Sequence, residues 1–508
     1  MFKNIQKYLL INYPLLWNTK VVPTTFILIV INLIFFFIGL EKGKLDFFEN
    51  DNNYTYDDEA VVIFFSILVS ILLLILWLVF YFKNNSFKSF YPKRTLSLFK
   101  EWSIVLFICL LISLFTSSYY YGKDVRMRSY FTEQEAKNRC EILSKASFFI
   151  EGSYSNNYNY NYNDYSEVAV AEEAKAAVTA ADTAVAANDS IKFNGKRYSF
   201  YSLLNKNVNS YTFFDYDSDS IRKKTIKTWL VNQQKDSIKS IFKKYLAIAK
   251  EHNLKANIDE NKWFDLVYDY PSFMNYREIG PSDVNYEYYE NVNQKQDSIN
   301  RYIKVIKGVK YEYYRYFVPE KSLNFNYNKI SEAWVSPNMN FTSILIPFYF
   351  AIALSLLIFG FRVTSGRNWL IAVISLGVVS ILLGIFSIII NSDYSFAIAL
   401  ILLTTFTFIY FFATISRKKS KNISGVILNA LLWLFPCFFP LIYYVILEIL
   451  KDLAQAGPSN YLQSEYYPAI QFMKDNGLIF GYLNIVFIII LMLFLSVKIK
   501  QWRGLAEG

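Results

Sequence analysis

Apolar residues gather into eight blocks along the chain, each close to the ~20 residues that a helix needs to cross a ~30 Å hydrocarbon core. Aromatic residues flank the shortest block, with Trp102 before it and Tyr119 after it, as expected at a membrane interface. The first block lacks a small-residue cleavage site, so we expect an anchor and not a removed signal peptide. The predicted spans are 21–40, 60–82, 102–119, 343–361, 369–390, 394–415, 424–447 and 478–497.

Lys and Arg divide unevenly between the two sets of short connections. One set, which includes both termini, carries seventeen basic residues and two acidic ones, Glu101 and Glu507. The opposite set carries four basic and twelve acidic residues. Because cytoplasmic loops are enriched in Lys and Arg, both termini are predicted to be cytoplasmic and residues 120–342 to lie outside. The net charge of +10 then reflects topology, and we expect no nucleic-acid partner.

The predicted fold is an all-α polytopic membrane protein with about eight transmembrane helices and both termini inside. Apolar residues make up 54% of the 508 positions, which supports this class. The predicted regions are an N-terminal amphipathic helix with spans one to three (1–119), an extracytoplasmic domain (120–342), and spans four to eight with a short basic tail (343–508). The Asn, Lys and Tyr content is typical of AT-rich bacteria, and we expect a multi-pass protein of the bacterial inner membrane.

The segment YPKRTLSLFKEW, residues 91–102, predicts an amphipathic helix along the inner membrane face. On a helical wheel, Leu96, Phe99 and Trp102 share one side. The other side carries the cations Lys93, Arg94 and Lys100. This helix either anchors the third span or docks a partner. The N-terminal segment, residues 1–18, repeats the design.

The outer domain is predicted to be mostly helical, with a small sheet. An Ala-rich stretch at 166–189 predicts a helix. A stronger helix is predicted over 218–251, and a further one over 285–308. The apolar face of the stronger helix comprises Ile238, Ile241, Phe242, Tyr245 and Leu246. A short strand is predicted over 197–204.

Tyr-rich stretches are a second feature of this domain. The stretch SNNYNYNYNDY, residues 155–165, predicts a surface loop. Two clusters, YEYYE at 286–290 and YEYYRYF at 311–317, fit a ligand-binding surface, packing inside the domain or a position at the level of the lipid head groups.

Residues for catalysis or metal binding are scarce. The only histidine, His252, stands near a predicted helix end, so we expect a solvated or capping residue. Cys109 and Cys437 fall in apolar spans, which leaves Cys140 without a disulfide partner in the soluble part. The sequence contains no phosphate-binding loop and no HExxH or GxSxG motif. We therefore expect no enzyme activity, no cofactor and no metal site.

The predicted spans carry no ionisable residue well inside them, which argues against a proton-coupled carrier. Span seven carries two prolines one turn apart, Pro436 and Pro440. They free backbone carbonyls and predict a kink, which serves either as a gating hinge or as a static bend. The connection 448–477 is too long for a tight turn, so it either dips back into the membrane or forms a surface helix.

From residue 83 onward the elements follow a recognisable order. An amphipathic cytoplasmic helix, one span, a large outer domain and five more spans lead to a short basic tail, VKIKQWRGLAEG. This layout resembles the membrane subunit of an ABC-type exporter of the six-span class. The resemblance implies a dimer of permeases whose cytoplasmic face docks separate ATP-hydrolysing subunits. The chain departs from the family by two additional spans and by its large outer domain.

We therefore expect a permease-like subunit of a bacterial ABC-type transport complex, embedded in the lipid bilayer and powered by a separate cytoplasmic ATPase. The candidate docking residues are Lys93, Arg94, Lys100, Arg362, Arg367, Arg417, Lys418 and Lys419. The alternative is a membrane-anchored binding or scaffold protein whose outer domain recognises a ligand or envelope partner. A membrane enzyme for lipid-linked substrates is a third hypothesis, for which only Glu448 and the acids of 57–59 stand at the membrane boundary.

Overall fold

The computed structural model contains two compact units. Unit 1 holds Met1–Gly39, Asp57–Gly122 and Met339–Gly508, and unit 2 holds Leu40–Tyr56 and Lys123–Asn338. The chain thus passes between the units four times. The structure describes residues 7–8, 11–12, 20–47, 56–84, 96–150, 191–193, 196–198, 211–267, 286–287, 301–306, 309–314, 316–390, 394–417, 421–456 and 464–503.

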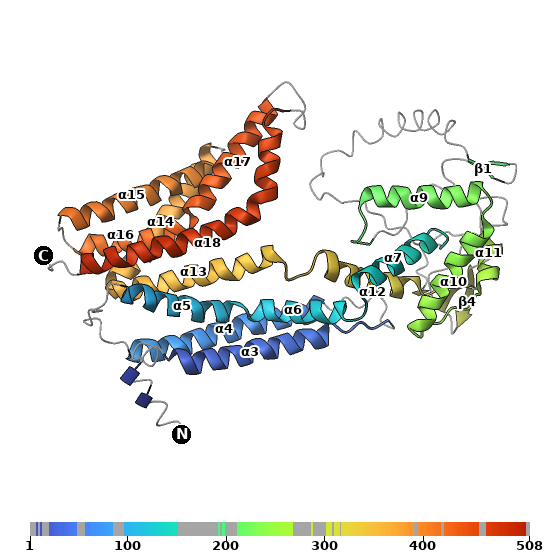
Figure 1. Cartoon of the computed structure of the whole chain (residues 1–508), viewed down its shortest axis with the longest axis horizontal. Coiled ribbons are helices and arrows are strands. Elements are labelled where there is room, and N and C mark those ends of the chain that lie inside the picture. Colours follow the sequence, from blue (N-terminus) through green and yellow to red (C-terminus); the bar gives the residue numbers. More distant parts are fainter. Residues whose placement is uncertain are drawn as a thin grey trace. The chain divides into compact units, whose positions relative to one another are not determined.

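Long apolar helices make up unit 1 (Figure 1). Before the longer segment of unit 2 come α3 (Val21–Lys42), α4 (Tyr56–Asn84), α5 (Ser97–Ser113) and α6 (Phe115–Arg128), of which α3 and α6 each end inside unit 2. After it come α13 (Phe341–Val363), α14 (Gly366–Ile390), α15 (Ser395–Arg417), α16 (Lys421–Leu434), the 3-10 turn η2 (Phe435–Cys437), α17 (Phe438–Ala456) and α18 (Tyr467–Arg503). Among the described residues, seven helical segments are long and apolar enough to cross a membrane, and the bent pair α5–α6 would make eight. These helices fit a multi-pass membrane protein.

The third predicted span is not one straight helix, because α5 and α6 meet at Leu114 with a bend of 48°. Side chains of the first two spans bond to the backbone at this break. Asn32 Nδ2 of α3 donates to the Leu111 carbonyl at 3.0 Å, and Ser70 Oγ of α4 donates to the Ile112 carbonyl at 3.2 Å. Such donors compensate for backbone bonds that a broken helix loses in a bilayer.

Two apolar cores hold unit 1 together. One joins α3, α4, α5 and α6 with α13, and its buried residues include Leu28, Trp77, Ile108, Phe115 and Ala351. The other joins α5, α13, α15, α16, η2 and α18, and its buried residues include Leu98, Leu356, Phe411, Leu428 and Ile488. The first two spans are therefore part of the packed bundle.

The described parts of the connection 448–477 prolong α17 and α18 instead of forming a separate surface helix. The two helices pack along each other, and Ala454 and Ile470 are fully buried. With 37 residues, α18 is about 55 Å long at ~1.5 Å per residue, well beyond a ~30 Å hydrocarbon core. The predicted span 478–497 is only its apolar centre.

The predicted amphipathic segment is in part the start of α5. Its first five residues, 91–95, lie outside the described residues. In α5, Leu98 and Trp102 are buried in the second apolar core, whereas Leu96, just before the helix, is exposed. Two residues of the predicted apolar face, Phe99 and Trp102, pack against this core, so only Leu96 departs from the prediction. The core that they join includes α13, against which α5 packs.

Unit 2 is mostly helical in its described residues. Its helices are α7 (Glu133–Ser147), α9 (Tyr216–Val231), α10 (Lys235–Glu251), α11 (Glu260–Val267) and α12 (Glu320–Val335). The helix predicted over 218–251 forms as two, α9 and α10, separated at Gln233, whose φ of 53° is left-handed. The predicted apolar face of α10 is confirmed, because Ile238, Ile241, Phe242 and Tyr245 are buried and Leu246 is partly buried.

Short strands accompany these helices. β1 (Ile191–Phe193) pairs antiparallel with β2 (Lys196–Tyr198), which covers only the start of the strand predicted over 197–204. A second sheet has the order β3 (Tyr286–Glu287), β5 (Val309–Tyr314), β4 (Arg301–Ile306). The helix predicted over 285–308 is thus wrong where it is described. Tyr, Val and Ile are frequent there, and these residues favour extended chain.

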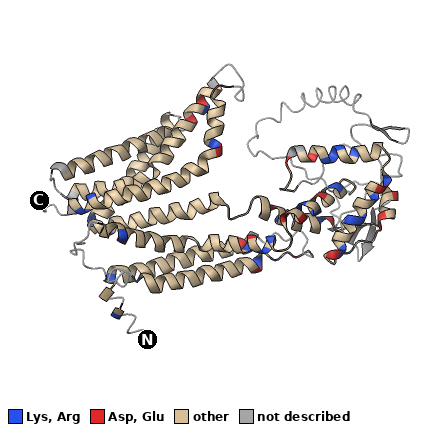
Figure 2. Cartoon of the chain, viewed as in Figure 1, with Lys and Arg blue, Asp and Glu red and all other residues tan. Residues whose placement is uncertain are grey.

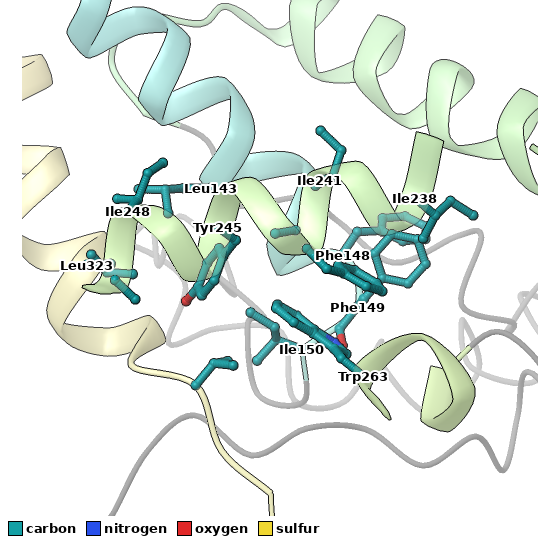
Figure 3. Close-up of a cluster of buried hydrophobic side chains, with 14 of the residues drawn as sticks. Leu143, Phe148, Phe149, Ile150, Ile238, Ile241, Tyr245, Ile248, Trp263 and Leu323 are labelled. Carbon is teal, nitrogen blue, oxygen red and sulfur yellow. The ribbon is translucent and has the colours of Figure 1, made fainter. Parts of the chain in front are cut away.

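The core of unit 2 lies among α7, α10, α11 and α12 (Figure 3). Phe242 of α10 stacks on Trp263 of α11 with ring centroids 4.2 Å apart. Phe149, which follows α7, meets the Phe242 ring edge-on at 5.1 Å. The aromatic contacts join the segment after α7 to α10 and α11, so unit 2 has a core of its own.

The stretch that follows α3, residues 43–47, belongs to unit 2. The Asp46 carbonyl accepts from Asn326 Nδ2 at 3.1 Å, and the Phe47 carbonyl accepts from the Ser322 hydroxyl. The Phe47 ring stacks on His252 with centroids 3.7 Å apart. The connection between the first two spans is thereby bound to α12 and to the end of α10.

Several predicted features fall outside the described residues. They are the loop at 155–165, the Ala-rich helix at 166–189, most of the N-terminal segment 1–18, and most of the Tyr cluster 286–290. These features stay predictions.

Candidate functional site

Most described Lys and Arg residues of unit 1 gather at one end of its helices (Figure 2). This basic end is formed by the end of α4, the start of α5, the α13–α14 turn and the end of α18. Its described basic residues include Lys83, Lys100, Arg362, Arg367, Lys498 and Lys500. The opposite end of α17 and α18 carries the acids Glu448, Asp452, Glu465 and Asp475. The charge asymmetry expected from the sequence is thus present along the helices.

The predicted docking residues fall into four groups. Lys100 and Arg367 are exposed at the basic end. Arg417 is the last residue of α15. Outside the described residues lie Lys93, Arg94, Lys418 and Lys419. Arg362 differs from all of these, because it is buried.

Arg362 forms an ion pair with Glu101, with 2.9 Å between Arg362 Nε and Glu101 Oε1. Only 8% of Arg362 and 7% of Glu101 are exposed. The same carboxylate oxygen accepts a hydrogen bond of 2.6 Å from the hydroxyl of Tyr81, which is fully buried. The ends of α4, α5 and α13 therefore meet in one buried polar cluster, which we call the Tyr81–Glu101–Arg362 cluster.

Burial makes this cluster sensitive to the loss of any partner. Removing one member of a buried ion pair typically costs about 3–5 kcal/mol, because the other charge stays buried without compensation. Tyr81 satisfies part of the hydrogen-bonding capacity of Glu101, and Arg362 Nη1 has no hydrogen-bond partner among the described residues. The cluster thus holds three helix ends in a fixed arrangement beside the exposed Lys100.

Two further hydrogen bonds fix the surroundings of the cluster. Trp102 Nε1 donates to Ser355 Oγ at 3.1 Å, which is a second side-chain bond between α5 and α13. Asn429 Nδ2 of α16 donates to Thr364 Oγ1 at 2.9 Å, which ties down the turn that presents Arg367. Close packing accompanies this bond, since a methyl group at Gly360 would overlap the Asn429 amide oxygen.

Sequence reasoning missed Glu101 as a site residue, although a signal was present. Glu101 is one of two acids among nineteen charged residues in the predicted cytoplasmic segments. An acid next to so many basic side chains has cations available for an ion pair, and this was the signal. Arg362 was predicted to be a docking cation. This role is wrong, because Arg362 is buried in an ion pair with Glu101.

The seventh span changes its hydrogen-bonding pattern at the first of the two predicted prolines. Pro436 lies in η2, and Pro440 lies in the first turn of α17. Pro440 has no N–H, so the Pro436 carbonyl lacks its helical partner. Asn484 Nδ2 of α18 donates to that carbonyl at 2.9 Å and to the Tyr349 hydroxyl of α13 at 2.9 Å. The break is therefore tied to two neighbouring helices.

The sequence predicted that His252 is either a capping or a solvated residue. It caps the C-terminal end of α10 and is half-buried, so the first role is confirmed and the second is not. Its Nε2 lies 2.9 Å from the Tyr327 hydroxyl, and its ring stacks on Phe47. Burial lowers the pKa of His252; the Glu251 carboxylate opposes this shift, and the Arg139 guanidinium adds to it. The neutral imidazole is therefore the form that unit 2 favours.

Groups suited to metal or thiol chemistry are few in the part of the chain that the structure describes. It contains no cluster of three or more His, Cys, Asp or Glu side chains that could hold a metal ion. Cys140 is buried in the core of unit 2, and burial raises the pKa of its thiol, which disfavours the reactive thiolate.

No protein-family model, no curated protein and no solved structure matches this chain. Inference of function therefore starts from the basic end of unit 1 and from the buried cluster within it.

Proposed function

We propose that the chain is the permease-like membrane subunit of a bacterial transport complex of the ABC type, powered by a separate cytoplasmic ATPase. The basic end of unit 1 carries this proposal. There, the exposed Lys100 and Arg367 flank the buried pair of Glu101 and Arg362. Exposed cations on helix ends that are held rigidly offer a docking surface to an acidic partner, because little order is lost on binding.

The proposal also fixes an orientation. The basic end faces the cytoplasm, because cytoplasmic segments of membrane proteins are enriched in Lys and Arg. Unit 2 then lies outside the cytoplasmic membrane, and two copies of the chain act together, as in the family whose layout it resembles. The long apolar helices of unit 1 surround the route of transport.

Reversal of the exposed charges tests the docking surface. The tagged chain is purified from its native membranes in mild detergent, and co-eluting proteins are identified by mass spectrometry. Wild-type protein should retain an ATP-binding subunit, and the double variant Lys100→Glu with Arg367→Glu should lose most of it, because like charges then face the partner. The variant Lys474→Glu, which reverses an exposed charge at the opposite end of α18, should retain it.

Two results would count against this proposal. If the double variant retains the ATPase, the proposed docking surface is wrong. If the wild-type sample contains no ATP-binding protein, the proposed transport role is wrong. In the second case, co-elution of an envelope or secreted protein favours the alternative function, a membrane-anchored binding or scaffold protein. The separate aromatic core of unit 2 supports that alternative, because a recognition domain needs a stable fold of its own.

A further inference from the structure

Helix α10 of unit 2 carries its basic residues on one side. Between its first and last residue it has five lysines and two acids. Four of these lysines lie within about 80° of arc on a wheel of 3.6 residues per turn, and they are spread over the length of the helix. We call this set the α10 lysine stripe. Its members are Lys235, Lys239, Lys243 and Lys250.

The opposite side of α10 holds the stripe in a fixed direction. Ile241, Tyr245 and Ile248 of that side lie in the core of unit 2 (Figure 3). Lys243 and Lys250 are exposed. At ~1.5 Å per residue, lysines four positions apart are separated by ~6 Å along the axis, and the whole stripe is ~22 Å long. The core thus presents a straight row of cations to the surroundings.

Neutral groups, and not acids, surround the ordered member of the stripe. Lys239 Nζ donates to the Asn261 amide oxygen at 3.2 Å and lies 4.8 Å from the centre of the Phe264 ring. Both contacts orient the ammonium group without cancelling its charge. Lys243 and Lys250 form no ion pair with any residue that the structure describes. The charge of the stripe is therefore available to an external partner.

The neighbouring helix α7 shows the opposite arrangement. Its Arg139 forms ion pairs with Glu135 and with Glu251, and its Lys145 forms one with Glu141. Glu251 is one of the two acids of α10, so α7 engages it and the stripe does not. The other acid of α10, Asp236, lies in the first turn, where a negative charge favours the helix N-terminus.

The side chains around the stripe indicate the class of partner. No large apolar side chain of α10 is exposed, so the helix lacks the apolar face by which a surface helix enters a lipid bilayer. For the same reason it offers no aromatic platform on which nucleic-acid bases could stack. Lysine binds anions as a point charge, without the planar fork of arginine. The stripe therefore fits a hydrated chain of repeated anions.

We infer that the α10 lysine stripe binds a soluble linear polymer with a phosphate group in each repeat. Lysines spaced along a straight helix can contact successive phosphates of one extended chain, and each contact releases a condensed counterion. This binding is a property of unit 2 alone. Only the source of the polymer, the cell envelope, rests on the orientation given under the proposed function.

Binding of inorganic polyphosphate to the full-length chain tests the inference. The chain is placed in nanodiscs of phosphatidylcholine, and the anisotropy of fluorescently labelled polyphosphate is measured at several salt concentrations. Wild-type protein should bind, and its affinity should fall as salt rises. The triple variant Lys239→Gln, Lys243→Gln and Lys250→Gln should bind roughly tenfold more weakly and depend less steeply on salt, because fewer counterions are released.

A matched control separates the stripe from the net charge of the chain. The variant Lys100→Gln, Arg367→Gln and Lys137→Gln removes the same number of charges at exposed positions outside the stripe. It should keep the wild-type affinity within about twofold, because these side chains do not contact the polymer. Equal weakening by the two triple variants overturns the inference.

Two further measurements complete the test. The double variant Lys243→Gln with Lys250→Gln leaves the Lys239 contacts in place and replaces the triple variant if that one does not fold. Vesicles of phosphatidylglycerol replace polyphosphate in a parallel assay. If the stripe variants lose binding to these vesicles but bind polyphosphate as wild type does, the partner is a lipid head group and the inference of a polymer is wrong.

Discussion

At the scale of single residues, Glu101 determines how Arg362 is held at the end of the fourth span. A guanidinium with 8% of its surface exposed needs a counter-charge, and Glu101 provides it at 2.9 Å. The cationic charge is therefore cancelled inside the bundle, while Lys100 stays exposed next to it. Because of Glu101, Arg362 has a structural role, whereas the exposed Lys100 is available to a partner.

His252 yields a prediction of pH dependence in unit 2. Its pKa is lower in the folded chain than its ordinary value near 6.5, so the unfolded chain binds the proton more readily. Stability from this residue is present above about pH 6.5 and is lost as the pH falls through the lower folded pKa. In His252→Gln, unit 2 should lose less stability between pH 7.5 and pH 5.5 than wild type.

Hydrogen exchange of α10 and of residues 43–47 at the two pH values measures this difference, after correction for the intrinsic pH dependence of exchange. Gln keeps a polar contact to Tyr327 and does not titrate, so it isolates the protonation of residue 252. Equal loss of protection in wild type and variant would refute the role of His252. Glu251, whose pKa is lowered by its hydrogen bonds from Arg139, acts in a separate window at lower pH.

Residue-level chemistry was only partly predictable from the sequence. The charge pattern correctly located Lys100 and Arg367 on the exposed basic end. It gave Arg362 the same role, because burial depends on helices far apart in the sequence: Arg362 and Glu101 are 261 positions apart. The stacking of His252 on Phe47 was hidden for the same reason.

At the scale of elements, the α5–α6 break and the η2 turn are stabilised in the same way. An Asn side chain from a neighbouring helix bonds to the interrupted backbone: Asn32 at the α5–α6 break and Asn484 at η2. In hydrocarbon, an unpaired carbonyl has no water to replace its partner, so a polar neighbour stabilises the break. Asn32 and Asn484 thus mark the two places where these helices depart from regularity.

Replacement of Asn484 tests this role. Asn484→Leu leaves the Pro436 carbonyl unpaired in a buried position, and the free energy of unfolding should fall by about 1–3 kcal/mol. Equilibrium unfolding in detergent measures the change. The control Asn476→Leu, on the same helix, removes an amide whose bond to Phe472 stays within α18, and it should have little effect. Equal destabilisation by both variants would contradict a special role for Asn484.

Apolar periodicity predicted the position of most helices, but not their interruptions or the strands. The bend at Leu114 has neither Pro nor Gly beside it, so no local signal announces it. The break between α9 and α10 at Gln233 likewise has no Pro or Gly beside it. In 301–314, helical and extended patterns compete, and pairing between strands decides in favour of the sheet.

At the scale of the whole molecule, the proposed orientation predicts which ends are accessible from outside the cell. A cysteine at Lys474 should react with a membrane-impermeant maleimide on intact cells, because that end of α18 would face outward. A cysteine at Ser365, exposed in the α13–α14 turn, should react only after the membrane is permeabilised. Unsubstituted protein measures the background from Cys437, and the reverse labelling pattern would exclude the orientation.

The unit boundaries differ from the predicted domain by more than a few residues. Lys123–Asn338 lies close to the predicted 120–342, but unit 2 also takes in Leu40–Tyr56. Backbone carbonyls of Asp46 and Phe47 make two of the bonds that hold this stretch, and any residue type supplies a carbonyl. These two bonds therefore leave no side-chain pattern by which the sequence could assign the stretch to the domain.

The attachment of residues 43–47 to α12 also determines when unit 2 can complete its folding during synthesis. Asp46 and its partner Asn326 are 280 positions apart. At about 5–20 residues per second, roughly 14 to 56 seconds pass between the synthesis of the two residues. Phe47 lacks the ring of His252 until residue 252 has been made, and it lacks helix α12 for the whole of this delay. Residues 43–47 are therefore synthesised early, but they can pack into unit 2 only after α12 has been made.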